Sequence, residues 1–246
     1  MKFISIIFGR IWAVWGLIVF AITCSIVYIP IMLTKLVAEP KGTAIFRAIS
    51  KVWMRIYLTL IGCRLVIKGQ DNFKKGKTYV VVCNHNSFMD VPLTTPFIPG
   101  ANRTIAKKSI SKVPIFGPIY TRGSVLVDRN SDDSRRRSFE LMKQTLTQGL
   151  HMVIYPEGTR NRTNNPLNPF YDGAFKLAIE SKKEIIPTLL FNTRKVLPAD
   201  KGFYLKPHQL EMHFLSAIPT EGRTIKEVKD QVYRIMWEYY NLARKR

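Results

Sequence analysis

The chain has 246 residues and carries 38 Lys and Arg against 17 Asp and Glu, a formal net charge of +21. This length allows one sizeable core and argues against several independent catalytic domains, while the charge favours polyanionic partners such as nucleic acid, anionic lipid surfaces or phosphorylated substrates. Cys24, Cys63 and Cys83 stand in apolar runs without metal-ligand spacing, which argues against a cysteine-based metal site and predicts buried, reduced thiols.

A long apolar segment lies near the start of the chain. No charged residue occurs between Arg10 and Lys35, and residues 11–33 are almost entirely apolar. That is about the length needed to cross a hydrocarbon core of ~30 Å, and it exceeds the apolar part of an ordinary signal peptide. We expect this segment to be held in a membrane, either across the bilayer or within one leaflet. Positive charge accumulates after Lys35, so the rest of the chain is expected on the cytoplasmic side of the cell inner membrane or of another membrane.

A second helical pattern follows between Thr43 and Lys68. Apolar residues fill one face, while Arg47, Lys51 and Arg55 recur four apart. This pattern predicts a basic amphipathic helix lying on a membrane surface, and a helix packed on the surface of the domain is the alternative. We therefore divide the chain into an N-terminal membrane anchor with an amphipathic helix, residues 1–62, and a catalytic domain, residues 63–246.

Strand-like and helical segments alternate in the rest of the chain. Strands are expected at residues 64–68, 79–83, 124–127, 151–155, 185–191 and 209–215, and helices at 91–98, 132–148, 172–181 and from 225 onward. This order predicts an α/β fold with a largely parallel, mixed sheet flanked by helices.

Residues 84–90, with the sequence NHNSFMD, follow the expected strand 79–83. They combine an imidazole, a carboxylate, a hydroxyl and two amides, a density of proton-handling groups that packing alone does not require. The ordinary pKa of histidine suits a general base near neutral pH, so His85 is predicted to take a proton. Asp90 can fold back through a turn to hold the imidazole, as the third member of a catalytic triad does. For Ser87, capping the turn, orienting Asp90 and contacting the substrate all stay open.

A candidate anion-binding loop, residues 155–162 with the sequence YPEGTRNR, follows the expected strand 151–155. Gly158 permits tight backbone geometry, Thr159 offers a hydroxyl, and Arg160 presents planar donors that suit phosphate oxygens. A solvated basic face is the alternative for this loop alone.

Cations also alternate with apolar residues between Lys107 and Arg129. This pattern predicts a groove that holds a charged headgroup beside an aliphatic chain. A solvated basic surface is again the alternative for this stretch by itself.

Taken together, these segments resemble the family of 1-acylglycerol-3-phosphate acyltransferases over roughly residues 84–188. Four blocks in the family's order carry the resemblance. Residues 84–90 resemble its N-H-x-S-x-x-D block, and Pro156 to Arg160 resemble its E-G-T-R block. The second block is matched by Lys108, Pro114, Gly117, Arg122, Asp128 and Arg129, and the fourth by Ile186 and Pro187.

The resemblance implies transfer of a fatty acyl group from an acyl-CoA or acyl-carrier-protein thioester to the sn-2 hydroxyl of 1-acyl-sn-glycerol-3-phosphate, which makes phosphatidic acid. It implies no metal and no other cofactor, with His85 and Asp90 as the catalytic residues. The substrate-binding residues that it implies are Asn84, Ser87, Lys108, Gly117, Arg122, Glu157, Gly158, Thr159 and Arg160. The expected partners are lysophosphatidic acid in the membrane, the thioester carrier and an anionic membrane surface.

Two alternatives to this function stay open at this point. The acceptor could be another lysophospholipid, glycerol 3-phosphate or a lyso-aminolipid, because the blocks describe the chemistry more than the headgroup. A basic nucleic-acid-binding module is the more distant alternative, but the chain has no recognisable binding motif, so no nucleic acid partner is expected.

No covalent nucleophile is predicted. Cys83 adjoins His85 but ends a buried apolar run, where a thiol packs as a small hydrophobe. The acceptor hydroxyl is therefore expected to attack the thioester directly, with nearby backbone amides as candidate oxyanion donors. The other histidines have no partner carboxylate at a useful spacing and are expected to be structural; they are His151, His208 and His213.

Overall fold

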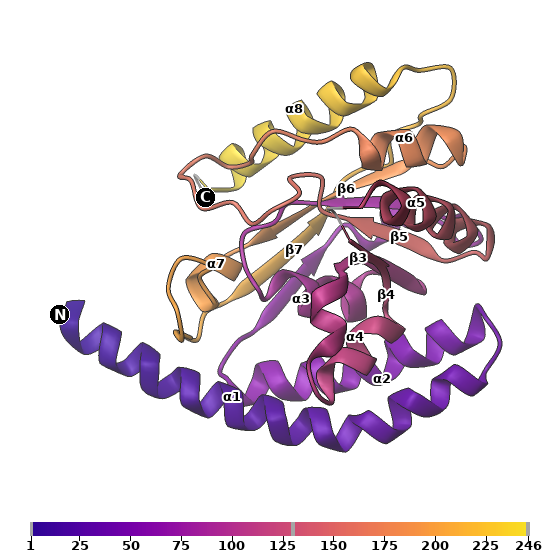
Figure 1. Ribbon diagram of the computed structural model, residues 1–246. Helices are drawn as coiled ribbons and strands as arrows, with labels where there is room; N and C mark the ends of the chain where they lie inside the picture. Colours follow the sequence, from indigo (N-terminus) through magenta and orange to yellow (C-terminus); the bar gives the residue numbers. More distant parts are fainter. Residues whose placement is uncertain (1, 129–130, 245–246) are drawn as a thin grey trace.

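The structure, a computed structural model, describes residues 2–128 and 131–244. Its middle layer is a seven-stranded sheet with the order β1-β7-β6-β2-β5-β3-β4, and helices cover both faces (Figure 1). The strands are β1 Leu65–Lys68, β2 Val80–Cys83, β3 Asn102–Lys107, β4 Ser124–Val127, β5 His151–Ile154, β6 Ile185–Phe191 and β7 Leu210–Phe214. The helices are α1 Lys2–Leu33, α2 Lys41–Leu60, α3 Asp90–Phe97, α4 Phe116–Arg122, α5 Asp132–Thr147, α6 Gly173–Glu180, α7 Thr193–Val196 and α8 Ile225–Arg244.

Every neighbouring pair of strands in this sheet is parallel except β6 and β7, which are antiparallel. The predicted α/β fold with a largely parallel, mixed sheet flanked by helices is therefore confirmed. β2, β5 and β6 are buried along their whole length, as their mainly apolar sequences predict for strands covered on both faces. Because β2, β3, β4 and β5 are mutually parallel, their carboxyl ends meet at one edge of the sheet.

Alternating side chains of β2 enter two separate cores. Val81 and Cys83 belong to the core that includes α1, α2 and α3, whereas Val80 and Val82 belong to the core that includes α5, α6 and α8. Figure 1 shows α1 and α2 on one side of the sheet and α8 on the other. The end of β2 is thus held from both faces, which gives the segment after it a rigid attachment.

Strand β3 is missing from the sequence-based prediction. Its sequence, NRTIAK, is mostly polar, yet it pairs with β5 on one side and β4 on the other. Buried and less buried residues alternate along it, because only one of its faces is well covered. Asn102 and Thr104 point to the buried face. Alternation of apolar and polar residues therefore does not mark this strand, because two of its buried positions are polar.

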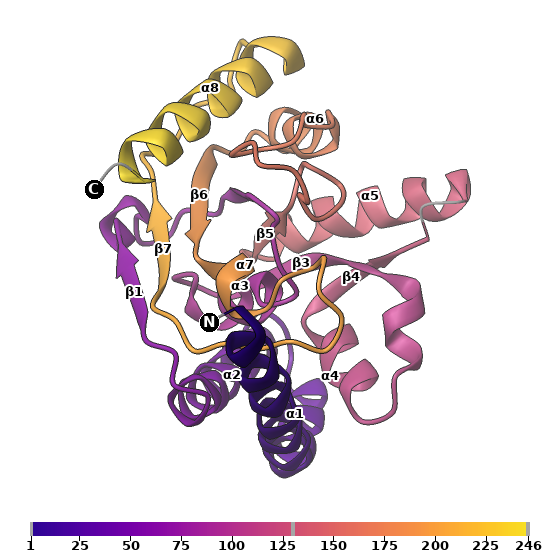
Figure 2. The ribbon, with the colours of Figure 1, turned by 90° about the vertical axis from the view of Figure 1, so that its left-hand side faces the viewer.

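Helices α1 and α2 form a hairpin along one face of the domain (Figure 1). Glycines at positions 9 and 16 lie on the buried side of α1, where the absence of a side chain allows close packing. Leu205 N donates to Gly9 O at 3.0 Å, and Trp12 Nε1 donates to Ile61 O at 3.0 Å. Figure 2 shows the chain segment after α7 passing beside α1, in keeping with these contacts. The predicted helix over residues 11–33 is confirmed, with additional helical residues at its start.

The opposite side of the hairpin is apolar and exposed. On α1 the exposed residues include Ile4, Ile11, Val14, Leu17, Ile18, Ile22, Ile26, Ile29 and Leu33, and on α2 they are Ile45, Val52, Ile56 and Leu60. The stretch Ile4–Leu36 is long and apolar enough to cross a membrane, by length and composition.

Helix α2 packs on the domain through its other face. Phe46, Trp53 and Tyr57 are buried there, and Arg47 donates from Nε to Ile98 O at 2.6 Å. One face of α2 is therefore packed on the domain, as the alternative interpretation predicts. Its exposed face is apolar, as the prediction of a helix on a membrane surface requires. The division of the chain at residue 62 stays a prediction.

A buried ionic cluster fastens the bend of the hairpin to the domain. Glu39 Oε1 lies 2.7 Å from Arg103 Nη2 and 3.0 Å from Arg122 Nη1. Arg122, at the end of α4, also donates from Nε to Thr34 Oγ1 at 3.0 Å and from Nη1 to Thr43 Oγ1 at 3.1 Å. Its side chain is almost fully buried, so the guanidinium links the hairpin to the sheet through buried contacts.

We predict that Arg122→Ala lowers the free energy of unfolding by about 3–5 kcal/mol, because removing one partner of a buried ion pair leaves the other groups unpaired. Guanidinium chloride unfolding in detergent, followed by tryptophan fluorescence, measures this. Arg136→Ala, which truncates an exposed arginine, is the matched control and should change the stability by less than about 0.5 kcal/mol. Equal stabilities of the two variants would contradict the assignment.

Candidate active site

Three loops converge at the carboxyl edge of the sheet. They follow β2, β5 and β3, and these strands are neighbours in the order β2-β5-β3. The loop after β2 holds His85, the loop after β5 holds Glu157 and Arg160, and Lys108 follows β3 directly. The parallel sheet therefore brings together residues that lie far apart in the sequence.

His85 and Asp90 form a close pair. His85 Nδ1 lies 2.8 Å from Asp90 Oδ2, and the same oxygen accepts hydrogen bonds from Asn86 N at 2.6 Å and Ser87 N at 2.8 Å. Asp90 is fully buried, whereas the His85 side chain is 17% exposed. Because the carboxylate accepts at Nδ1, that nitrogen carries the proton, and Nε2 is left as the basic nitrogen. Asp90 is also the first residue of α3, where the positive end of the helix dipole favours its charge.

Tyr155 packs against the imidazole. The ring centroids of His85 and Tyr155 are 4.4 Å apart, and the Tyr155 hydroxyl lies 2.7 Å from Thr94 Oγ1, on α3. Burial raises the pKa of Tyr155 well above its ordinary value, so the ring stays neutral beside the base. Sequence reasoning missed this residue, and the only signal for it is an aromatic side chain at the end of a buried strand, next to the E-G-T-R block.

Two residues predicted to bind substrate are instead bonded within the protein. Asn84 is fully buried; its Nδ2 donates to Leu190 O at 3.0 Å, and its Oδ1 accepts from Leu190 N at 2.7 Å. Ser87 is also fully buried; its Oγ donates to Leu197 O at 2.5 Å and accepts from Met89 N at 3.0 Å. These bonds fix the turn that presents His85, and they disfavour the prediction that Asn84 and Ser87 bind substrate.

Glu157 holds the loops after β2 and β5 together. Oε1 accepts from His85 N at 2.7 Å, and Oε2 accepts from Asn168 N at 2.9 Å. Its side chain is 2% exposed, and burial raises its pKa to about 7. Among the residues predicted to bind substrate, Glu157 is thus engaged in holding two loops together, and these bonds favour that role over a contact with the acceptor. Gly158 follows with a φ of 68°, a left-handed conformation that suits glycine.

The second block contributes one exposed cation and one close-packed glycine. Lys108 is exposed, and its ammonium makes no hydrogen bond or ion pair with the residues that the structure describes. Gly117 is buried, and a Cβ built on it would lie 2.3 Å from Ser111 O. Gly117 therefore shapes the loop after β3 through its backbone and offers no side chain to a substrate.

Arg122 lies away from this edge. It precedes β4, and therefore stands at the amino end of the parallel strands, where Glu39, Thr34 and Thr43 occupy its guanidinium. This placement disfavours the prediction that Arg122 binds the substrate phosphate. Arg129, the other arginine of the second block, lies outside the described residues.

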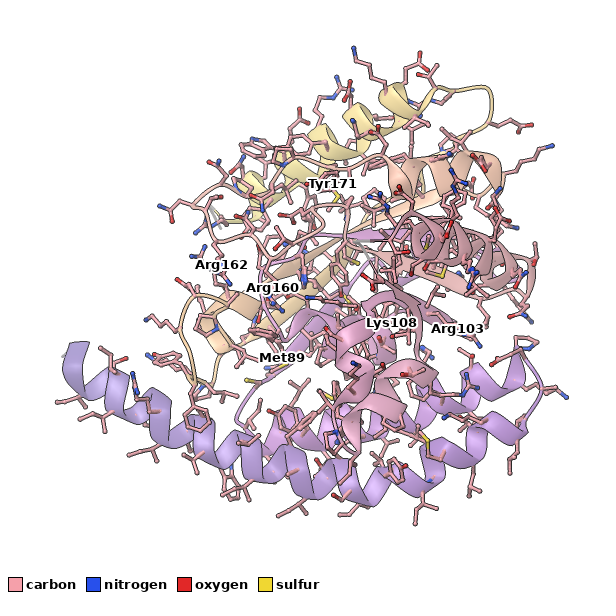
Figure 3. All side chains as sticks on the ribbon, viewed as in Figure 1. Met89, Arg103, Lys108, Arg160, Arg162 and Tyr171 are labelled. Carbon is pink, nitrogen blue, oxygen red and sulfur yellow. The ribbon has the colours of Figure 1, made fainter. Side chains whose placement is uncertain are left out.

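Arg160 is the available guanidinium of the site. It is partly buried, and burial lowers its pKa, while nearby Asp90 acts to raise it. Within residues 2–128 and 131–244 its side chain makes no hydrogen bond or ion pair, so its donors are free for a ligand. Arg160, Arg162 of the same loop, and Lys108, which follows β3, can be located in Figure 3. Thr159, beside Arg160, is exposed and also remains a candidate for binding substrate.

The remaining nucleophile and histidine candidates have structural surroundings. Cys83 is fully buried, and burial raises the pKa of its thiol, in keeping with its prediction as a core residue. His151 Nδ1 accepts from Tyr79 N at 3.0 Å, and burial lowers its pKa to about 4. For His213 the expectation of no partner carboxylate is wrong: Nε2 lies 2.9 Å from Glu211 Oε2, because residues two apart on a strand share a face.

No cluster of three or more His, Cys, Asp or Glu side chains that could hold a metal ion occurs among the described residues. The expectation of a reaction without metal or other cofactor stays a prediction.

Comparison with known proteins identifies the family. A family model described as Acyltransferase matches residues 64–190, about half of the chain, and the chain belongs to this family. The match spans β1 to β6, and thus includes the loops that carry His85, Lys108 and Glu157.

Among curated relatives, the chain is similar to the human 1-acyl-sn-glycerol-3-phosphate acyltransferase alpha, with 31% identity over 177 residues that cover 69% of this chain and 60% of the relative. It is 28% identical over 183 residues to the 1-acyl-sn-glycerol-3-phosphate acyltransferase of Cocos nucifera, covering 74% of this chain and 58% of the relative. The chain thus spans about 60% of the length of these relatives.

Among solved structures, the fold resembles the crystal structure of the 1-acyl-sn-glycerophosphate (LPA) acyltransferase PlsC from Thermotoga maritima. The TM-score is 0.84 at 18% identity, and the match covers 98% of both chains. This likeness supports the fold assignment over the whole chain, including the helical hairpin.

The raised pKa of Glu157 predicts a pH-dependent stability. Between pH 4.5, the ordinary pKa of a glutamate, and about 7, the folded protein holds this proton while the unfolded chain releases it. The free energy of unfolding therefore falls as pH rises through this window, by on the order of 3 kcal/mol. Glu157→Gln removes this slope. At pH 5 the variant is also less stable than the wild type, by about 1–3 kcal/mol, because its amide nitrogen faces a backbone N–H donor.

Denaturant unfolding at pH 5, 6, 7 and 8 measures both effects. Glu221→Gln, at an exposed glutamate, is the control and should keep the wild-type slope. Parallel stability curves for the wild type and Glu157→Gln would show that Glu157 does not titrate in this range.

Proposed function

We propose that the protein transfers a fatty acyl group from an acyl-CoA or acyl-carrier-protein thioester to the sn-2 hydroxyl of 1-acyl-sn-glycerol-3-phosphate, making phosphatidic acid. The observation that carries this proposal is the His85–Asp90 pair at 2.8 Å, with the unpaired Arg160 on the adjacent loop. Such a pair supplies a base for a hydroxyl, and such an arginine supplies donors for a phosphate. The names of the relatives support the same acceptor.

His85 acts as the general base. The acceptor hydroxyl binds at Nε2, and its oxygen attacks the thioester carbonyl carbon while the proton passes to Nε2. Asp90 stabilises the resulting imidazolium through Nδ1. When the C–S bond breaks, the thiolate leaves and takes up the proton, so the base is regenerated. Cys83 is too deeply buried to act as a covalent nucleophile, which favours this direct transfer.

Arg160 and Lys108 bind the phosphate of the acceptor. A guanidinium offers paired N–H donors in the plane of a phosphate edge, and an ammonium adds a mobile point charge. Neither side chain makes a hydrogen bond or ion pair among the described residues, and the two follow the neighbouring strands β5 and β3. An acceptor with a different headgroup remains the alternative, and a phosphate-free headgroup would make poor use of these two cations.

The exposed apolar face of α1 and α2 binds the membrane. Because α1 is packed along the domain from Gly9 to Thr34, we favour a hairpin lying in one leaflet over a helix crossing the bilayer. A basic protein is attracted to anionic lipid by about 1 kcal/mol for each cation near the surface. The cytoplasmic side of the cell inner membrane or of another membrane is the proposed location of the catalytic domain, from the excess of Lys and Arg after Lys35.

We expect His85→Ala to lower the rate of acyl transfer by about a hundred- to ten-thousand-fold, the usual contribution of general base catalysis. The assay uses purified full chain with radiolabelled acyl-CoA or acyl-carrier protein and a panel of acceptors: 1-acylglycerol 3-phosphate, glycerol 3-phosphate and other lysophospholipids. Asp90→Asn should lower the rate similarly. His208→Ala, at a histidine outside the site, is the control, and full activity of His85→Ala would rule out the assigned base.

We also expect Ile22→Glu with Ile26→Glu to weaken binding to anionic vesicles about tenfold or more, because two charges enter an apolar face. Both side chains are exposed, so the fold should be unaffected. Leu242→Glu, at an exposed leucine on α8, is the matched control and should bind as the wild type does. Vesicle sedimentation measures the binding, and equal binding by all three proteins would place the membrane contact elsewhere.

A further inference from the structure

We propose that Phe88 is a positioning residue for the substrate-binding arginine: its ring holds the Arg160 guanidinium flat, so that the in-plane N–H donors face the phosphate of the acceptor. This inference rests on the proposed function and adds a residue to which the four sequence blocks give no role. Arg160 Cζ lies 3.6 Å from the centroid of the Phe88 ring, the geometry of a direct cation–π stack.

The backbone around Phe88 directs its ring outward. Ser87 and Met89, on either side, are both buried, and Ser87 Oγ bonds to Met89 N and Leu197 O. The Phe88 ring is 53% exposed, so it adds little to the core. An exposed aromatic ring on an otherwise buried and rigid turn therefore serves as a fixed platform at the rim of the site.

Stacking orients Arg160 without neutralising it. A carboxylate partner would occupy N–H donors and offset the charge, as at Arg122, whose Nη1 lies 3.0 Å from Glu39 Oε1. The Phe88 ring contacts the face of the guanidinium instead, and this leaves the edge donors free. Asp90 is close enough to influence Arg160, but neither of its oxygens bonds to the guanidinium among the described residues. Oδ2 is taken by His85, Asn86 and Ser87, and the buried Oδ1 has no hydrogen-bond partner. The charge of Arg160 is thus kept for an external anion.

If Phe88 pre-orients the Arg160 guanidinium, its loss should weaken binding of acceptors that carry a phosphate. Without the ring, Arg160 samples more rotamers and must be ordered when the acceptor binds. The attack of the hydroxyl on the thioester depends on His85 and should be much less affected. A role of Phe88 in contacting the acyl chain predicts something different, namely an equal loss for acceptors with and without a phosphate.

The test compares wild type, Phe88→Leu, Phe88→Tyr and Phe203→Leu, each as full chain in mixed micelles. Phe203 is also 53% exposed and stacks with no cation among the described residues, so Phe203→Leu is the matched control. We expect Phe88→Leu to raise KM for 1-acylglycerol 3-phosphate about two- to fivefold, with a smaller change in kcat. Its inhibition constant for 1-acylglycerol, which lacks the phosphate, should stay as in the wild type, and Phe88→Tyr should restore the KM.

A double-mutant cycle with Arg160→Ala tests the contact itself: in that background Phe88→Leu should change KM no further. Equal losses for both acceptors, failure of Phe88→Tyr to restore KM, or an undiminished effect without Arg160 would each overturn the positioning role. Binding of a fluorescent lysophosphatidate without thioester separates this outcome from failure of the proposed reaction. Binding that depends on Phe88 without turnover would overturn only the reaction, whereas turnover with binding independent of Phe88 would overturn only the positioning.

Discussion

The buried charge of Asp90 is the constraint on which the active-site edge depends. An isolated carboxylate in a core costs many kcal/mol unless its oxygens are hydrogen-bonded. Asp90 meets this condition at Oδ2, which accepts from two backbone N–H groups and faces the His85 imidazole, whereas the buried Oδ1 has no hydrogen-bond partner among the described residues. Its place at the start of α3 also favours the charge. Folding residues 84–90 back on the carboxylate supplies the partners of Oδ2, and that same fold sets the tautomer of His85. The turn and the base are therefore one structural unit.

Neighbouring strands keep this unit in place. Asn84 bonds to both backbone groups of Leu190 on β6, and the loop after β5 holds the main chain of His85 from both sides, through Glu157 and through Asn161 N at 2.6 Å. Precise placement of a base by surrounding hydrogen bonds reduces the reorganisation needed for reaction. The segment after α7 bonds both to this turn and to α1, through Leu197 and Leu205. The hairpin and the catalytic turn are therefore linked by a short stretch of chain.

The sequence predicts contacts between residues a few positions apart, but not contacts between residues far apart in the chain. His85 and Asp90 are five residues apart, so a single turn dictates their meeting. Thr224 and Glu227, three residues apart, likewise form a capping box at the start of α8. The partners of Asn84, Ser87 and Arg122 lie 106, 110 and 88 residues away. No spacing pattern encodes contacts over such separations, so the sequence assigns these polar residues to substrate although their side chains are bonded within the protein. The sequence does not predict strand β3 for a related reason: its burial follows from its pairing with β4 and β5 and not from its own composition.

The Lys and Arg side chains of this protein differ in whether their N–H donors are already bonded within the protein. Net charge attracts polyanions in general, but a cation binds a ligand strongly only when its donors are free. Arg122 and Arg103 share Glu39, and Arg194 donates to the carbonyl oxygens of Thr163 and Arg162, so these arginines stabilise the protein itself. Arg160 and Lys108 keep their donors and stand at the edge that carries His85. The acidic member of the same loop, Glu157, is buried with a raised pKa, which weakens its competition for Arg160. Under the proposed function, a substrate phosphate therefore meets Arg160 and Lys108, which make no hydrogen bond or ion pair among the described residues. It does so beside His85, which Asp90 orients.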